Sequence, residues 1–166
     1  MASLAARNGR LAAVLALAGC LAACASARDD DQRAPLTGTM KPYVVNGNRY
    51  TPRAVNHYSE TGVASLYAPD YACQRTANGE LFDGRSLTAA HKTLPLPSTV
   101  EVINLANGRR VRVRVNDRGP FVKSRLIDLS PAAADRLGFS RRQTERVKVR
   151  YIGPAPEATA ARRRCR

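Results

Sequence analysis

The clearest pattern of hydrophobic and polar positions along the chain lies between residues 110 and 130. Three valines at alternate positions from Val111 to Val115 are interleaved with three arginines, and this period of two predicts a half-buried strand. A polar turn, Asn116 to Pro120, ends the strand. A carboxylate at the end of a strand can be held rigidly and still reach solvent, which makes Asp117 a candidate for chemistry. The same residue also suits an ordinary turn, because an Asp side chain bonds the backbone two residues on.

Further short apolar runs predict strands at residues 62–67, 87–90, 99–105, 126–129 and 145–152. One short helix is predicted after Ser130, a good N-cap, with Pro131 at its first position and Gly138 at its C-terminal end. About six short strands and one helix therefore occupy roughly 90 residues. Sheet closure is the usual way for so many short strands to avoid exposed edges, so we expect a mainly β fold, a small six-stranded barrel.

The first 23 residues have the features of a bacterial lipoprotein signal. Two arginines precede an apolar stretch that is far too short to span a membrane. Two overlapping endings follow, each with Leu, two small residues and Cys, before which signal peptidase II cleaves. We prefer Cys24 as the lipidated residue, because small and polar residues follow it, and keep Cys20 as the alternative. The lipid would anchor the chain facing the periplasm, and Ala25 favours the outer membrane over the inner.

The remaining sequence divides by composition into four parts. Residues 24–40 contain an acidic run and no apolar period, which is typical of a flexible tether. Residues 41–60 hold two short apolar pieces around Asn46-Gly47, a hairpin signal that predicts a small β arm, with His57 at the surface. The barrel is expected at residues 61–152, and residues 153–166 form a basic tail that we expect to be disordered.

Charge and composition narrow the choice of partners. The formal net charge is +14 at pH 7, so anionic envelope polymers and lipid head groups are natural partners. Aromatic residues make up only 5% of the chain and no nucleic-acid motif appears, which argues against nucleic-acid binding. His57 and His91 have no ligand spacing, so neither a metal nor another cofactor is indicated. A disulfide between Cys73 and Cys165 suits an oxidising compartment, but the sequence leaves this pairing open.

Several motifs, in this order and spacing, resemble the rare lipoprotein A family: GVASLYAPD, RTANGELFD, LTAAHKTLP, VEVINLANGR and VRVNDRGPFV followed by RLIDLSPAAADRLG. The resemblance covers about residues 41–152. It implies a double-psi β-barrel and a peptidoglycan lytic transglycosylase, which is a carbon–oxygen lyase acting on polysaccharide. Members of the family are lipoproteins that cleave MurNAc–GlcNAc strands, prefer strands without stem peptides, and help daughter cells to separate.

The functional positions of that family fall on three motifs of this chain. The resemblance implies that Asp117 is the general acid and base, assisted by Glu80 and His91. Without the resemblance, Glu80 also suits a solvated turn and His91 a core-edge histidine that bonds the backbone. The side chains expected to bind the glycan are Tyr67, Thr76, Asn78 and Arg118.

Glycosidic cleavage suits these residue types, because a carboxylic acid must protonate the leaving oxygen. In a lytic transglycosylase the 6-hydroxyl of muramic acid then attacks in place of water and leaves a 1,6-anhydro end, so one acid that later acts as base is enough. The alternative is a non-catalytic, expansin-like lipoprotein that binds peptidoglycan. Leu66 stands where many members have Trp, which weakens sugar stacking there, and residues 71–73 depart from the family's Phe-His-Gly. We expect a monomer bound to glycan strands and to the membrane.

Overall fold

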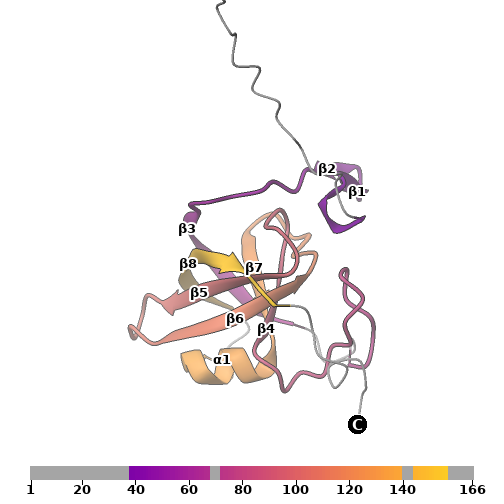
Figure 1. Cartoon of the computed structure of the whole chain (residues 1–166). Coiled ribbons are helices and arrows are strands. Elements are labelled where there is room, and N and C mark those ends of the chain that lie inside the picture. Colours follow the sequence, from indigo (N-terminus) through magenta and orange to yellow (C-terminus); the bar gives the residue numbers. More distant parts are fainter. Residues whose placement is uncertain (1–37, 68–71, 140–143, 157–166) are drawn as a thin grey trace, which may run out of the picture. The chain divides into compact units, whose positions relative to one another are not determined.

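The computed structural model of the chain describes residues 38–67, 72–139 and 144–156. Six strands of this part close into a barrel in the order β3-β7-β4-β6-β5-β8, which confirms the predicted fold class (Figure 1). Their bounds are β3 Ser59–Leu66, β4 Thr88–His91, β5 Ser98–Asn104, β6 Arg110–Asp117, β7 Arg125–Leu129 and β8 Thr144–Pro154. The predicted signal, most of the predicted tether and residues 157–166 lie outside the described residues, as do Cys20, Cys24 and Cys165.

The barrel is mixed, with parallel and antiparallel neighbours. β3 pairs with β7 and β4 with β6 in parallel, while the other four pairs are antiparallel. Because β4 lies between β6 and β7, Ala90 on β4 is the register partner of both Asp117 on β6 and Asp128 on β7. The topology therefore places these two carboxylates on either side of one small residue.

The core follows the alternation that the sequence displays. Val111, Val113 and Val115 of β6 are buried in the barrel with valines of β5 and β8. Two of the three interleaved arginines, Arg110 and Arg112, are exposed on the outer face. Arg114 departs from this pattern, because it is buried and pairs with a carboxylate.

The helix α1, Pro131–Leu137, has the caps that the sequence predicts. The Ser130 hydroxyl accepts a hydrogen bond from the backbone N–H of Ala133 at 3.2 Å, and Gly138 ends the helix in the left-handed conformation, with φ 79°. In Figure 1, α1 lies below the barrel. Among the described residues no helix is long and apolar enough to cross a membrane.

The arm forms the predicted hairpin. The 3-10 turn η1, Gly38–Met40, precedes β1, Tyr43–Val45, and β2, Asn48–Tyr50, which pair antiparallel. Asn46 and Gly47 have φ 48° and 73°, the positive values that a tight hairpin turn of the I′ type requires. His57 is exposed, as expected. β3 begins at Ser59, earlier than its alternation indicates, because it pairs with β8 from that residue onward.

Candidate active site

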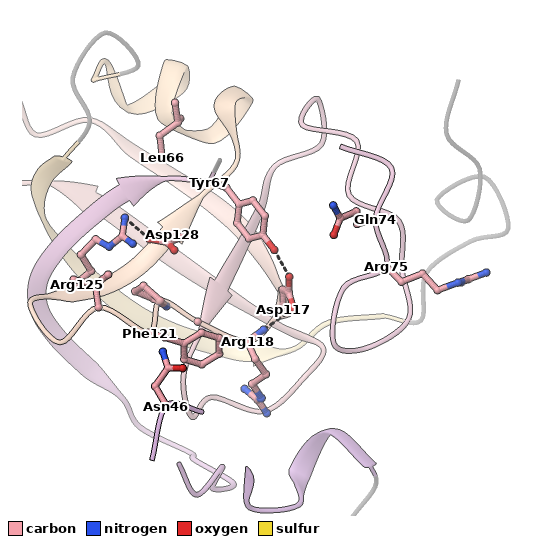
Figure 2. Close-up of a pocket in the computed structure, with 13 residues that line it drawn as sticks. Asn46, Leu66, Tyr67, Gln74, Arg75, Asp117, Arg118, Phe121, Arg125 and Asp128 are labelled. Carbon is pink, nitrogen blue, oxygen red and sulfur yellow. Dashed lines mark hydrogen bonds and ion pairs between the residues drawn. The ribbon is translucent and has the colours of Figure 1, made fainter. Parts of the chain in front are cut away.

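An open pocket of about 490 Å³ lies at the C-terminal end of β6. Its walls come from the hairpin turn of the arm, the end of β3, the loop at residues 74–75, the turn after β6, and β7 (Figure 2). The pocket contains two carboxylates, Asp117 and Asp128, and the two arginines Arg118 and Arg125. Acidic and basic groups thus face one cavity that is open to solvent.

Asp117 lines this pocket, and three donors fix its carboxylate. Oδ1 accepts the backbone N–H of Ala77 at 2.8 Å and that of Arg118 at 2.7 Å. Oδ2 accepts the hydroxyl of Tyr67, which points at it in Figure 2. Gly119 lies two residues on with φ 135°, where an L side chain would be strained. The turn of β6 therefore holds the acid in place, with Oδ1 anchored to the backbone and Oδ2 next to Tyr67.

Glu80 does not line the pocket, although it is bonded to Asn116, the residue before Asp117. Its side chain is buried and accepts from Arg114 Nη2 at 2.5 Å, Asn116 Nδ2 at 3.0 Å and Asn78 Nδ2 at 2.7 Å. Burial alone would raise the pKa of Glu80, but the hydrogen bonds from Arg114, Asn116 and Asn78 outweigh it and lower the pKa overall. Glu80 is therefore a buried, ionised carboxylate whose two oxygens are both hydrogen-bonded within the protein.

Thr76 and Asn78 belong to the loop that carries Glu80. The Thr76 hydroxyl donates to Asn78 Oδ1 at 2.8 Å, and the Asn78 backbone N–H donates to the Asn116 carbonyl at 3.3 Å. Neither residue lines the pocket. Their bonds join the loop to the strand residue before Asp117.

His91 is buried and likewise does not line the pocket. Its Nδ1 accepts the backbone N–H groups of Thr93 and Leu94 at 3.2 and 3.1 Å, so Nε2 carries the proton and donates to the Tyr58 hydroxyl at 2.9 Å. Burial, with Lys92 and Arg118 nearby, lowers the pKa of His91 to about 3. The imidazole is thus neutral and shapes the loop that follows β4.

Arg118 connects this loop to the pocket. Its Nη1 donates to the carbonyls of His91 and Leu94 at 3.1 and 2.7 Å, and Nη2 donates to the carbonyl of Thr39 at 2.6 Å. The guanidinium therefore joins the segment before the arm to the barrel, and Arg118 is among the residues that line the cavity.

Asp128 is the site residue that sequence reasoning missed. It accepts a hydrogen bond from the buried Ser65 hydroxyl, and its Oδ1 lies 3.9 Å from Arg125 Nη1. Burial raises its pKa above the usual value, although Ser65, Arg125 and Lys92 act in the opposite direction. In the sequence Asp128 is only a polar position in the run 126–129. Its place in the pocket depends on the pairing of β7 with β4.

Two departures from the family motifs also lie at or near the pocket. Leu66 lines it, next to Tyr67, whose ring packs on Phe82 with centroids 4.4 Å apart. Cys73 is disulfide-bonded, but the other three cysteines lie outside the described residues, so the predicted pairing with Cys165 stays a prediction.

The fold and the pocket together define a closed, six-stranded β-barrel of mixed strand directions with a pair of carboxylates in an open cavity. A family model described as lytic transglycolase matches residues 59–151, and the chain belongs to this family.

Curated relatives agree with this assignment. The chain is 53% identical over 123 residues to a protein named endolytic peptidoglycan transglycosylase RlpA from Pseudomonas aeruginosa, a match that covers 72% of this chain and 36% of the relative. It is 48% identical over 122 residues to a protein of the same name from Neisseria meningitidis, covering 73% of this chain and 51% of the relative. The chain thus spans about half the length of these relatives or less. Among solved structures, an expansin of Clavibacter michiganensis is 18% identical, with a TM-score of 0.44, over 61% of this chain and 53% of that one.

Proposed function

We propose that this chain is a lytic transglycosylase that cleaves the MurNAc–GlcNAc strands of peptidoglycan, preferably strands without stem peptides, and leaves 1,6-anhydro ends. The observation that carries the proposal is the Asp117 carboxylate, fixed by two backbone N–H groups and Tyr67 inside an open pocket. The names of the relatives support the same activity.

Asp117 serves first as acid and then as base. In its acid form it gives a proton to the glycosidic oxygen, and the bond from that oxygen to C1 of muramic acid breaks. The 6-hydroxyl oxygen then bonds to C1 and its proton passes to the Asp117 carboxylate, which restores the acid. Because two backbone N–H groups occupy Oδ1, the proton moves through Oδ2.

Glu80 and His91 assist as positioning residues. Glu80 bonds Asn116, the residue before Asp117, and Asn78 of the loop that supplies the Ala77 N–H. His91 orders the loop whose carbonyls hold Arg118. Of the expected glycan-binding residues, Tyr67 and Arg118 line the cavity and contact the sugar, while Thr76 and Asn78 act through the loop.

The cellular setting is part of the proposal. We propose that the chain is lipidated at Cys24, or at Cys20, and anchored at the outer membrane, where it works as a monomer on the cell wall during turnover and cell separation. The net charge of +14 suits contact with anionic envelope polymers. Labelling with radioactive palmitate tests the anchor: Cys24→Ser should abolish labelling, and labelling lost only in Cys20→Ser would move the anchor to Cys20.

The activity is tested by digestion of purified sacculi, and of sacculi stripped of stem peptides by an amidase, with mass spectrometry of the released ends. Wild-type chain should give 1,6-anhydro ends, and Asp117→Asn should lower their yield about 10²- to 10⁴-fold, the usual contribution of a general acid. Asp135→Asn, on the exposed face of α1, is the matched control and should leave the yield unchanged. Glycan binding without any anhydro product would favour the non-catalytic, expansin-like module instead.

A further inference from the structure

The arm carries an aromatic cluster beside the pocket. The residues of this cluster have no role in the proposed reaction. The rings of Tyr43 and Tyr50 are stacked with centroids 5.2 Å apart. Phe121, in the turn after β6, packs against both, at centroid distances of 6.2 and 5.6 Å. Phe121 also lines the pocket and is 38% exposed. The cluster is therefore continuous with the cavity that contains Asp117.

The register of the hairpin explains why the aromatic rings gather on one side of it. Tyr43 lies opposite Tyr50, and Val44 lies opposite Arg49. Side chains alternate between the two faces of a strand pair, so the two tyrosines share the face toward Phe121. Val44 belongs to the other face and is 62% exposed. One arm thus has an aromatic face toward the pocket and an opposite face toward solvent.

Several bonds fix the arm to the barrel. The Tyr43 hydroxyl donates to the Lys92 carbonyl at 2.8 Å, and the Arg53 N–H donates to the Thr93 carbonyl at 3.0 Å. The Arg118 guanidinium, already bonded to Thr39, lies 5.9 Å from the centre of the Tyr43 ring. A surface fixed in this way loses little conformational freedom when a ligand binds to it.

The hairpin turn adds a polar group next to the rings. Asn46 lines the same pocket as Phe121, and both lie on one side of Asp117 in Figure 2, with Gln74 and Arg75 on the other. Within the described residues the side-chain amide of Asn46 has no protein partner, so its donors and acceptor are available. A sugar ring offers apolar C–H faces and a hydroxyl edge, and aromatic surface with a few placed polar groups is the usual lining of a site for such a ligand.

We propose that Phe121, Tyr50 and Asn46 form an additional sugar subsite, which holds a ring of the glycan strand beyond the two sugars at the scissile bond. The inference rests on the proposed function, because the subsite is defined by its position relative to Asp117. The ring of Phe121 stacks on the sugar, Tyr50 supports it, and Asn46 bonds a hydroxyl group. Since a short glycan cannot fill both the catalytic pocket and the arm, affinity depends on strand length.

The test compares two peptide-free oligosaccharides of alternating GlcNAc and MurNAc, one of two sugars and one of eight. Binding is measured by calorimetry on the full chain carrying Asp117→Asn, which removes turnover. Adding Phe121→Ala should weaken binding of the eight-sugar ligand at least tenfold and leave the two-sugar ligand within twofold. Tyr50→Ala should act in the same direction, and Phe121→Tyr should keep the affinity. Val44→Ala, on the opposite face of the arm, is the matched control and should bind both ligands like its parent.

Undiminished binding of the eight-sugar ligand by Phe121→Ala would overturn the subsite, and so would an equal loss for both lengths, which would indicate a damaged pocket. If Phe121→Ala does not fold, Asn46→Gly carries the test. Glycine adopts the positive φ of this turn, and removal of the amide should weaken only the longer ligand, about threefold. Length-dependent binding by a wild-type chain that makes no anhydro ends would remove the proposed reaction but keep the subsite. If the wild-type chain makes anhydro ends but the arm variants bind glycan like their parent, the subsite would be overturned and the proposed reaction kept.

Discussion

Glu80 is bonded to Asn116, the residue before Asp117, but only Asp117 lines the pocket, and the two carboxylates have different surroundings. Glu80 is 5% exposed and its oxygens are bonded by Arg114, Asn116 and Asn78. Asp117 is half-buried, with its anchoring bonds on one oxygen and Tyr67 at the other. A carboxylate whose bonds are all used inside the protein stabilises structure, whereas one with an oxygen at a cavity can exchange a proton with a ligand. The structure thus gives different surroundings to two acidic residues that both belong to the quoted family motifs.

The largest effect is expected at the buried pair. Glu80→Gln leaves the Arg114 charge without its partner and should lower the free energy of unfolding by about 3–5 kcal/mol, measured by urea denaturation. The double variant with Glu80→Met and Arg114→Met removes both charges and should recover part of this loss. A Glu80→Gln variant that is as stable as the wild-type chain but inactive would contradict a purely structural role of Glu80 and indicate a direct part in the reaction.

His91 extends the comparison to pH. Its pKa is about 3 in the folded chain and near 6.5 when unfolded, so the unfolded state binds the extra proton between these values. Stability therefore falls as the pH drops below 6.5, by about 2 kcal/mol between pH 7 and pH 5. His91→Asn keeps an acceptor for the N–H groups of Thr93 and Leu94 and should lose this part of the pH dependence. Equal slopes of stability against pH for the two chains would show that folding does not lower the pKa of His91.

Substitution of Asp128 tests whether the second carboxylate that lines the pocket takes part in binding the glycan. Asp128→Asn should raise KM for glycan about tenfold and change kcat less, because a sugar hydroxyl bonds a charged oxygen more strongly than an amide oxygen. Since burial raises the pKa of Asp128, the wild-type chain should lose this contact as the pH falls, and the variant should not. Rate profiles of both chains from pH 4 to pH 8 measure the difference. A fall in kcat alone would instead place Asp128 in the proton transfer.

The smallest effect is expected at Tyr67. Tyr67→Phe removes the hydroxyl that bonds Asp117 Oδ2 and keeps the ring that packs on Phe82. One hydrogen bond of about 1 kcal/mol corresponds to roughly a fivefold loss of kcat, with unchanged thermal unfolding. A loss as large as that of Asp117→Asn would mean that the tyrosine itself carries the proton.

The alternation of β6 and the caps of α1 could be predicted from sequence because both depend on neighbours within a few residues. Asp117 could be picked out as a candidate because it follows a strand, where a carboxylate is held rigidly and still reaches solvent, and because it falls on a motif of the family, although the local pattern suits an ordinary turn as well. The ion pair of Glu80 with Arg114 could not, because Arg114 occupies a position of the outer face by its alternation and faces a loop that arrives from elsewhere in the chain. Asp128 was missed for a similar reason, since only the pairing of β4 with both β6 and β7 brings it to the pocket.

The pairing of β3 with β8 has a consequence for when the pocket can exist. Ser59 pairs with Arg150, and these residues lie at nearly opposite ends of the barrel sequence. Contacts between such distant positions form slowly, because the chain must first close a long loop. A nascent chain that stops before residue 144 lacks the strand that joins β3 to β5, so its barrel stays open. The closed barrel that holds the pocket therefore cannot form before β8 has been synthesised, because β8 lies between β3 and β5.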